Sequence, residues 1–165
     1  MALTSAAREQ LIAQYRDGYR AVSEALLRIT DEELDARPAP GRWSAREIVH
    51  HLADTEMNAA LRLRRLLVED RPALESLDQE ALARRLRYDR PHHASLEAFR
   101  WARETTAELL ECLTPDEWLR EGTHSELGPF GVERWLEIYA PHAHRHAVQI
   151  REARGAAGRG ARGTQ

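Results

Sequence analysis

GRWSAREIVHHLADTE, residues 41–56, begins a long amphipathic helix and sets the fold of this chain. Ser44 and Glu47 have the spacing of a capping box, in which each side chain accepts a hydrogen bond from the other residue's backbone N–H, so we expect the helix to begin here. Apolar residues then recur at three- and four-residue intervals, which predicts one buried face. His51 lies on that apolar face, whereas its neighbour His50 lies on the opposite, polar face.

A second segment, HAHRHAVQI at residues 142–150, places two more histidines on the apolar face of another expected helix. Because helical residues advance by about 100° each, His142 and His146 fall on the buried face, one turn apart. His144 falls on the polar face. Pro141 removes one backbone hydrogen bond immediately before these residues, so we expect the helix to bend there.

Three imidazoles on buried helix faces predict a metal site. Ring nitrogens need partners once water is removed, so imidazole is a poor filler for a helical core. His142 and His146 can share an ion, and His51 supplies a third ligand from another helix. Three histidines with an open fourth position are a known catalytic arrangement for zinc. The alternative is that the three are core histidines with separate hydrogen-bond partners.

Hydrophobic periodicity along the chain predicts an all-α protein. We expect four long helices, at residues 5–29, 44–69, 95–113 and 132–154. A charge-rich crossover, residues 70–94, separates the second and third helices and contains a helical piece near residues 79–86. The stretch EGTHSELGPFG, residues 121–131, has the composition of a loop.

One domain is expected over residues 1–154, because a chain of 165 residues can bury a single substantial core. The remaining stretch, GAAGRGARGTQ at residues 155–165, is rich in Gly and Arg and nearly free of large apolar groups. Such a composition cannot offset the entropy of ordering the chain, so we predict a disordered tail.

The composition also limits the partners and the compartment. The formal net charge of −3 gives no general attraction to nucleic acid or to an anionic membrane. No apolar run approaches the ~18 residues of a transmembrane helix, and the first residues, MALTSAAREQ, lack the pattern of a secretory signal. The single cysteine, Cys112, excludes an intrachain disulfide framework and fits a reducing compartment. We therefore predict a cytoplasmic protein.

Two residues of the third expected helix bear on its surroundings. Cys112 falls beside core-facing leucines, so we expect it to be buried rather than to act as a nucleophile. Trp101 lies well off the apolar stripe. An exposed tryptophan indicates a partner surface, such as a dimer contact.

The two histidine segments together resemble the DinB-like metalloprotein superfamily, which includes the YfiT-type proteins. Its second helix carries the motif W-S-x-x-E-I-x-x-H-L-x-D-x-E, and its last helix carries H-x-x-x-H, usually followed by Q-I. The matching residues here are Trp43, Ser44, Glu47, Ile48, His51, Leu52, Asp54 and Glu56, and then His142, His146, Gln149 and Ile150. The likeness in order and spacing covers about residues 5–154.

The resemblance implies a four-helix bundle in up-down-down-up order, with a long crossover between the second and third helices. It implies a divalent metal, zinc or nickel, bound by His51, His142 and His146 with water completing the shell. It also implies a homodimer.

For the reaction, the resemblance implies a thiol S-transferase or a thiol-dependent isomerase acting on a small molecule, with a low-molecular-weight thiol as partner. A metal-dependent hydrolase that uses a metal-bound water is one alternative. A non-catalytic, stress-associated metal-binding bundle is another.

Two further residues are candidates for catalytic roles at this site. Asp54, one turn after His51, can orient an imidazole or the bound water, although a helix-surface carboxylate is an equally good interpretation. Gln149, near the ligand face, can hydrogen-bond a ligand or the substrate, with filler at the edge of the core as the alternative.

Overall fold

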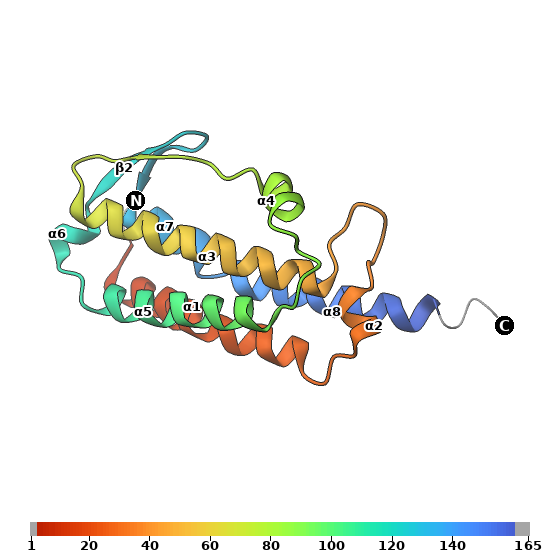
Figure 1. Cartoon of the computed structure of the whole chain (residues 1–165). Helices are drawn as coiled ribbons and strands as arrows, with labels where there is room; N and C mark the ends of the chain where they lie inside the picture. Colours follow the sequence, from red (N-terminus) through yellow and green to blue (C-terminus); the bar gives the residue numbers. More distant parts are fainter. Residues whose placement is uncertain (1–2, 161–165) are drawn as a thin grey trace.

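Four helical arms pack side by side into a bundle (Figure 1). The computed structural model describes residues 3–160. The helices are α1 (Ser5–Leu26), α2 (Asp31–Asp35), α3 (Ala45–Val68), α4 (Gln79–Arg85), α5 (His93–Glu111), α6 (Pro115–Trp118), α7 (Val132–Tyr139) and α8 (His142–Gly160). The arms are α1, α3, α5 and the consecutive pair α7 and α8. The predicted four-helix bundle is confirmed.

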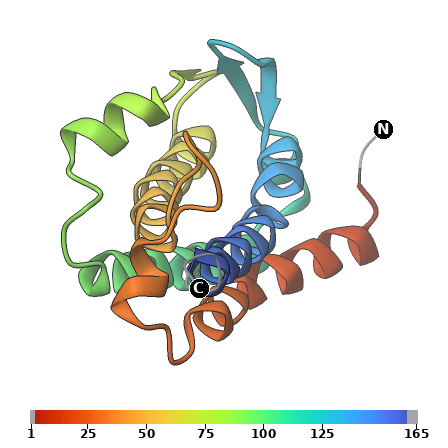
Figure 2. The same ribbon diagram turned by 90° about the vertical axis from the view of Figure 1, so that its right-hand side faces the viewer.

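The arms follow the expected up-down-down-up order. His50 lies near Ser95 and Arg64 lies near Thr106, so α3 and α5 run in the same direction. Contacts between α1 and α8 show that these two arms also run parallel to each other. Two consecutive parallel arms need a long connection, and α4 lies within it, to one side of the bundle (Figure 2).

The α3 helix begins where the sequence predicts. Ser44 Oγ accepts from the Glu47 N–H at 3.3 Å, and Glu47 Oε2 accepts from the Ser44 N–H at 2.8 Å. Leu52 and Leu63 of the expected stripe are fully buried. This cap and stripe turn His51, close to the start of α3, towards the interior of the bundle.

The last arm is interrupted at the proline. The α7 helix ends at Tyr139 and α8 begins at His142, with Ala140 and Pro141 between them. Proline has no N–H to donate, so the helical ladder cannot continue through it. The expected single helix over residues 132–154 is therefore two helices, with the break just before His142.

The predicted loop at residues 121–131 is wrong, because this stretch forms a β-hairpin. β2 (Glu121–His124) pairs antiparallel with β3 (Gly128–Gly131), and β1 (Ala73–Leu74) from the crossover pairs parallel with β2. A side chain at Gly122 would collide with the Pro72 carbonyl, so glycine lets the crossover approach. The strands are too short for alternation to show in the sequence.

Two other expectations are corrected. The predicted disordered tail begins at residue 155, but α8 continues to Gly160, where alanines favour the helix and Ala153 packs in the core. Residues 161–165 of that tail lie outside the described residues.

Cys112 is exposed rather than buried, because α5 ends at Glu111 and the backbone turns. Between residues 3 and 160, no helix is long and apolar enough to cross a membrane.

Candidate metal centre

The structure brings His51, His142 and His146 together from two helices. One ring nitrogen of each lies within 4.8 Å of the others. The Nε2 atoms of His142 and His146 are 3.2 Å apart, and the His51 ring centroid is 4.7 Å from that of His146. Two histidines four residues apart on α8 face a third from α3, as the helical phases predict.

Burial keeps these three rings neutral. Loss of solvent lowers the pKa of His51 to about 3 and that of His146 to about 4. Burial, with the neighbouring His146, lowers the pKa of His142 to about 2. Neutral imidazole is the form that binds a metal, so no proton has to leave at neutral pH.

The facing nitrogens fit a divalent metal. Zn–N distances of about 2.0–2.1 Å in a tetrahedral site place two ligand nitrogens roughly 3.3 Å apart. The Nε2 atoms of His142 and His146, at 3.2 Å, have this spacing. His142 Nδ1 is buried with no hydrogen-bond partner among the described residues, so its environment does not fix that ring by hydrogen bonding. The donor set therefore suits zinc or a similar ion.

Gln149 orients one of the three rings. Its Oε1 accepts from His146 Nδ1 at 2.8 Å. Because an amide oxygen can only accept, the proton of His146 sits on Nδ1 and the Nε2 lone pair faces His142. A ring held in this way is the usual arrangement around a metal-binding histidine.

Thr55 contacts His51 and was not singled out from the sequence. Its Oγ1 lies 3.3 Å from His51 Nδ1 and donates to the His51 carbonyl at 2.6 Å. The signal that could have found it is a polar residue one turn after His51 on the same apolar face.

Asp54 does not contact the three histidines in this structure. Its Oδ2 accepts from the Tyr88 hydroxyl at 2.7 Å, and none of its described hydrogen bonds reaches an imidazole of the set. Burial and the carboxylate raise the pKa of Tyr88, which therefore stays a donor. The Tyr88 ring packs against Trp43, and the Trp43 ring centroid is 4.7 Å from that of His51. Asp54 thus holds the crossover over the site.

His50 and His144 lie apart from the set, as expected. The expected polar face of His50 is nevertheless buried, because α5 and the crossover cover it. His50 Nε2 donates to the Arg90 carbonyl at 3.0 Å, and Nδ1 accepts from Ser95 at 2.7 Å. His144 is half-buried, and its Nε2 donates to a carbonyl of α1.

A cavity of about 420 Å³ opens beside His146. Trp43 and Gln149 also line it, so a small molecule there reaches the histidine set. Its rim carries charges of both signs, including Arg42 and Glu152, whose side chains are 4.0 Å apart. The site therefore has an aromatic wall, a hydrogen-bonding amide and a charged mouth.

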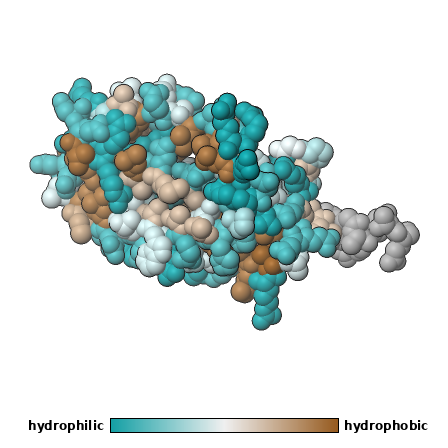
Figure 3. Space-filling view, in the orientation of Figure 1, coloured by the Kyte–Doolittle hydropathy of each residue, from teal (hydrophilic) through white to brown (hydrophobic). Residues whose placement is uncertain are grey.

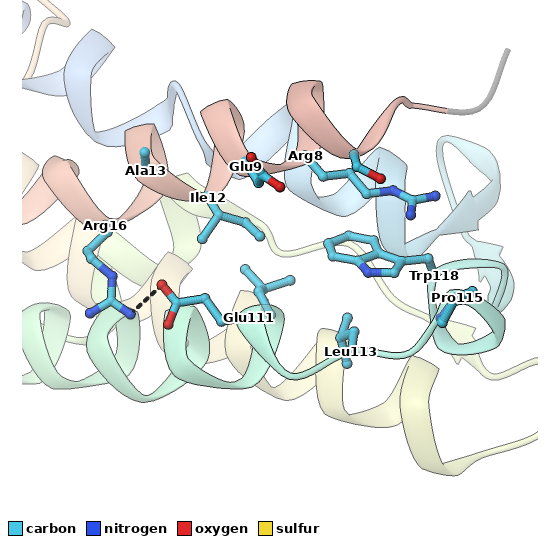
Figure 4. Close-up of a pocket in the computed structure, with 11 residues that line it drawn as sticks. Arg8, Glu9, Ile12, Ala13, Arg16, Glu111, Leu113, Pro115 and Trp118 are labelled. Atoms are coloured by element: carbon cyan, nitrogen blue, oxygen red, sulfur yellow. Dashed lines mark hydrogen bonds and ion pairs between the residues drawn. The ribbon is translucent and has the colours of Figure 1, made fainter.

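A larger cavity of about 540 Å³ lies between α1 and the end of α5 (Figure 4). None of the three histidines lines it. Trp118 closes one end under Arg8, which pairs with Glu133 at 2.6 Å. Arg16 pairs with Glu111 at 2.8 Å, shown by the dashed line. Both arginines of this cavity therefore have carboxylate partners.

A bundle of this topology, with imidazoles meeting from its second and last arms, defines a class of helical proteins with a histidine cluster between the arms. The sequence profile of the DinB superfamily matches residues 14–150, and the chain belongs to that superfamily.

Relatives and a solved structure agree with this assignment. A protein of Oceanobacillus iheyensis is 30% identical over 139 residues, which is 84% of this chain and 81% of that protein. YfiT of Bacillus subtilis is 30% identical over 134 residues, 79% of this chain and 75% of YfiT. Both bear the name "putative metal-dependent hydrolase". The solved YfiT structure, described as "an unusual four-helix bundle topology", superposes with a TM-score of 0.88 at 26% identity, covering 95% of this chain and 91% of YfiT.

Proposed function

We propose that this protein is a metal-dependent enzyme that acts on a small molecule, with His51, His142 and His146 as the metal ligands. The observation that carries the proposal is the 3.2 Å separation of the His142 and His146 Nε2 atoms, both in neutral, part-buried rings. Without an ion the two neutral rings can share one N–H···N hydrogen bond, whereas an ion between them would be bound by both Nε2 lone pairs.

Zinc or nickel is the metal we propose. Three imidazoles are borderline ligands that both ions accept. When bound, such an ion keeps its double positive charge and lowers the pKa of a water or thiol that it binds.

Three surrounding residues hold the rings at the site in place. Gln149 holds the proton of His146 on Nδ1 and so keeps Nε2 available. Trp43 covers one side of His51 and lines the cavity, which limits water at the site. Asp54 keeps Tyr88 packed against Trp43 and acts only through these rings.

Hydrolysis is the reaction class that the relatives' names support, and we propose it first. Transfer or isomerisation that depends on a low-molecular-weight thiol is the second candidate. The observation that favours it is the exposed cavity mouth, where Arg42 and Glu152 form only a loose ion pair at 4.0 Å and can each pair with a zwitterionic thiol instead.

Elemental analysis of protein purified without a histidine tag tests the metal site. About one equivalent of zinc or nickel per chain is expected, with the His51→Ala variant binding much less. His50→Ala is the matched control, because His50 is also buried on α3 but faces α5. Equal metal affinity in the wild type, His51→Ala and His50→Ala would contradict the proposed site.

Activity screens then separate the two reaction classes. The metal-loaded protein is assayed with ester and amide substrates, and with electrophiles in the presence of several low-molecular-weight thiols. Turnover without a thiol supports hydrolysis, whereas turnover that requires the thiol supports transfer. No turnover in either screen, with metal bound, would favour the stress-associated, non-catalytic bundle.

We further propose a homodimer through the face formed by α3 and α5. Met57, Leu61 and Val68 on α3 and Trp101 on α5 are exposed, and Trp101 is 57% accessible. Figure 3 shows pale to brown residues along this face. Such a concentration of exposed apolar groups is typical of partner surfaces.

Charge on this face favours a second copy as the partner. The helices α3 and α5 are parallel to each other. In a dimer whose two-fold axis runs parallel to them, α3 of one copy packs against α5 of the other. Arg64 of α3 then lies opposite Glu108 of α5, since both line one surface groove. Leu61→Arg is expected to yield monomers in sedimentation. Val148→Arg, at an exposed position of α8, is the control. A dimer that survives Leu61→Arg would overturn this interface.

A cytoplasmic location is also proposed. The single, exposed thiol of Cys112 fits a reducing compartment. Cell fractionation tests this proposal.

A further inference from the structure

We propose that Arg103, which has no described hydrogen bond to the three histidines, positions His142 by holding together all four arms of the bundle next to the site. The inference rests on the proposed metal site. It concerns a buried guanidinium on α5 whose partners lie on α1, α3 and α7. Arg103 is only 1% exposed, so its contacts are with the protein rather than with water.

The first contact lies at the helix break before His142. Pro141 has no N–H, and the described backbone bonds around the break run from Ala140 to α7 and from Arg145 to Pro141. None of these donors reaches the Tyr139 carbonyl. In a continuous helix the Tyr139 carbonyl would accept from the Ala143 N–H, and no described backbone bond joins these two groups. Arg103 Nη2 lies 3.4 Å from that oxygen and offers it a donor.

The second contact ties the break to α1. Arg103 Nε and Nη2 both donate to the Tyr15 carbonyl, at 2.9 and 2.6 Å. Gly18 makes room for this arrangement. A Cβ there would lie 2.8 Å from Arg103 Nη2 and 2.7 Å from the Ala143 Cβ. The start of α8 and the guanidinium therefore rest against α1 at the same point.

The third contact reaches α3, the helix that carries His51. Arg103 Nη1 donates to Glu56 Oε2 at 2.6 Å, and Glu56 is fully buried. The Tyr15 hydroxyl donates to the other carboxylate oxygen. Burial and the carboxylate raise the pKa of Tyr15, so the phenol remains a donor. Both oxygens of the carboxylate are thus satisfied.

The energetics indicate a role in geometry rather than in stability. Desolvating two charges costs about as much as their attraction returns, so well-packed apolar residues can replace a buried ion pair without loss of stability. Apolar residues cannot donate to the carbonyls of Tyr15 and Tyr139. The directed bonds of Arg103 therefore fix how α7 enters α8, and hence where His142 stands relative to His51.

Two variants and a control test this inference. Arg103→Met removes the donors but leaves Glu56 as an unpaired buried charge, which threatens folding. The double variant Arg103→Met with Glu56→Gln removes both charges and keeps the test possible if the single variant does not fold. Leu110→Ala, two turns later on α5 and 1% exposed, is the control for simple loss of stability.

The first measurement uses the metal-free proteins. We expect the ring NMR signals of His142 to shift in the double variant while those of His50, bonded to α5 and the crossover, stay in place. Leu110→Ala is expected to lower the melting temperature and leave the His142 signals unchanged. His142 signals that are unchanged in the double variant would overturn the inference.

The second measurement is Co²⁺ binding. A loss of affinity of at least tenfold in the double variant, with an altered visible spectrum, is expected, and Leu110→Ala should bind like the wild type. Equal affinity in the double variant and the wild type would overturn the positioning role. Absence of Co²⁺ binding by the wild type would instead overturn the metal site, and the NMR result on metal-free protein would still decide on Arg103.

Discussion

The Nε2 atoms of His142 and His146 face each other at 3.2 Å, and Gln149 holds the proton of His146 on the far side of its ring. The two nitrogens have only each other as partners among the described hydrogen bonds, so both are available to a cation between the rings. This arrangement also makes the role of the amide testable.

Replacing Gln149 by leucine should weaken metal binding about 10- to 100-fold, because the His146 ring loses its tautomer and orientation. Gln149→Glu should retain binding, since a carboxylate accepts the same proton. Competition with a chromogenic chelator measures both affinities. Wild-type affinity in Gln149→Leu would show that the amide does not orient the ligand.

Stability of the metal-free protein should fall as the pH falls from about 6.5 to about 4. In the unfolded chain the three histidines take up protons near pH 6.5, whereas burial lowers their pKa in the folded state to about 3 for His51, about 2 for His142 and about 4 for His146. The unfolded state therefore binds more protons across this window. Each histidine contributes a slope of about 1.4 kcal/mol per pH unit there.

Urea denaturation at several pH values measures this slope. The double variant His51→Gln with His146→Gln should show a shallower dependence, because only His142 of the three remains. The same slope in both proteins would assign the acid sensitivity to other groups.

Removing the metal should lower the melting temperature. Free metal at a hundredfold excess over its dissociation constant stabilises a folded protein by about 2.7 kcal/mol, which is roughly 5–10 °C for a chain of this size. Differential scanning calorimetry with and without a chelator measures the shift. The His51→Gln variant should show little shift, and a shift as large as in the wild type would place the ion elsewhere.

Trp43 should report the metal directly. Its ring centroid is 4.7 Å from that of His51, so Co²⁺ at the site should quench its fluorescence. Trp43→Phe should lose most of the quenching, whereas Trp101→Phe, an exposed residue on α5, should keep it. Equal quenching in these two variants would contradict the placement of the ion.

Gly18→Ala should destabilise the protein by about 1–3 kcal/mol despite the better helix propensity of alanine, because the new methyl group meets Ala143 and Arg103. Gly155→Ala is the matched control. It lies exposed within α8, and alanine there should stabilise by about 0.5–1 kcal/mol. Chemical denaturation of the two variants compares the effects. A destabilising effect of Gly155→Ala would contradict the helical continuation past residue 154.

Much of the fold and of the candidate site was predictable because both follow from helical phase. The Ser44 capping box marks the start of α3, and counting 100° per residue separates His51 from His50 without tertiary information. Pro141 predicts a bend in the last arm, because a proline cannot donate a helical hydrogen bond, and the structure has a full break there. Gln149 was a candidate for the same reason, since it lies almost one turn after His146 on the same face.

The sequence by itself determined which residues share a helix face, and therefore that His51, His142 and His146 point into the bundle. Only the tertiary structure decided what meets those faces from elsewhere in the chain. The parallel pairing of β1 with β2, the bond from Tyr88 to Asp54 and the cover over His50 all join segments more than 30 residues apart. Arg103 is another example. From the sequence a charged side chain is expected at the surface, but in the structure Glu56 and two carbonyls from other helices surround it. Helix periodicity is a local property of the backbone, whereas the partner of a buried charge is set by how distant elements pack.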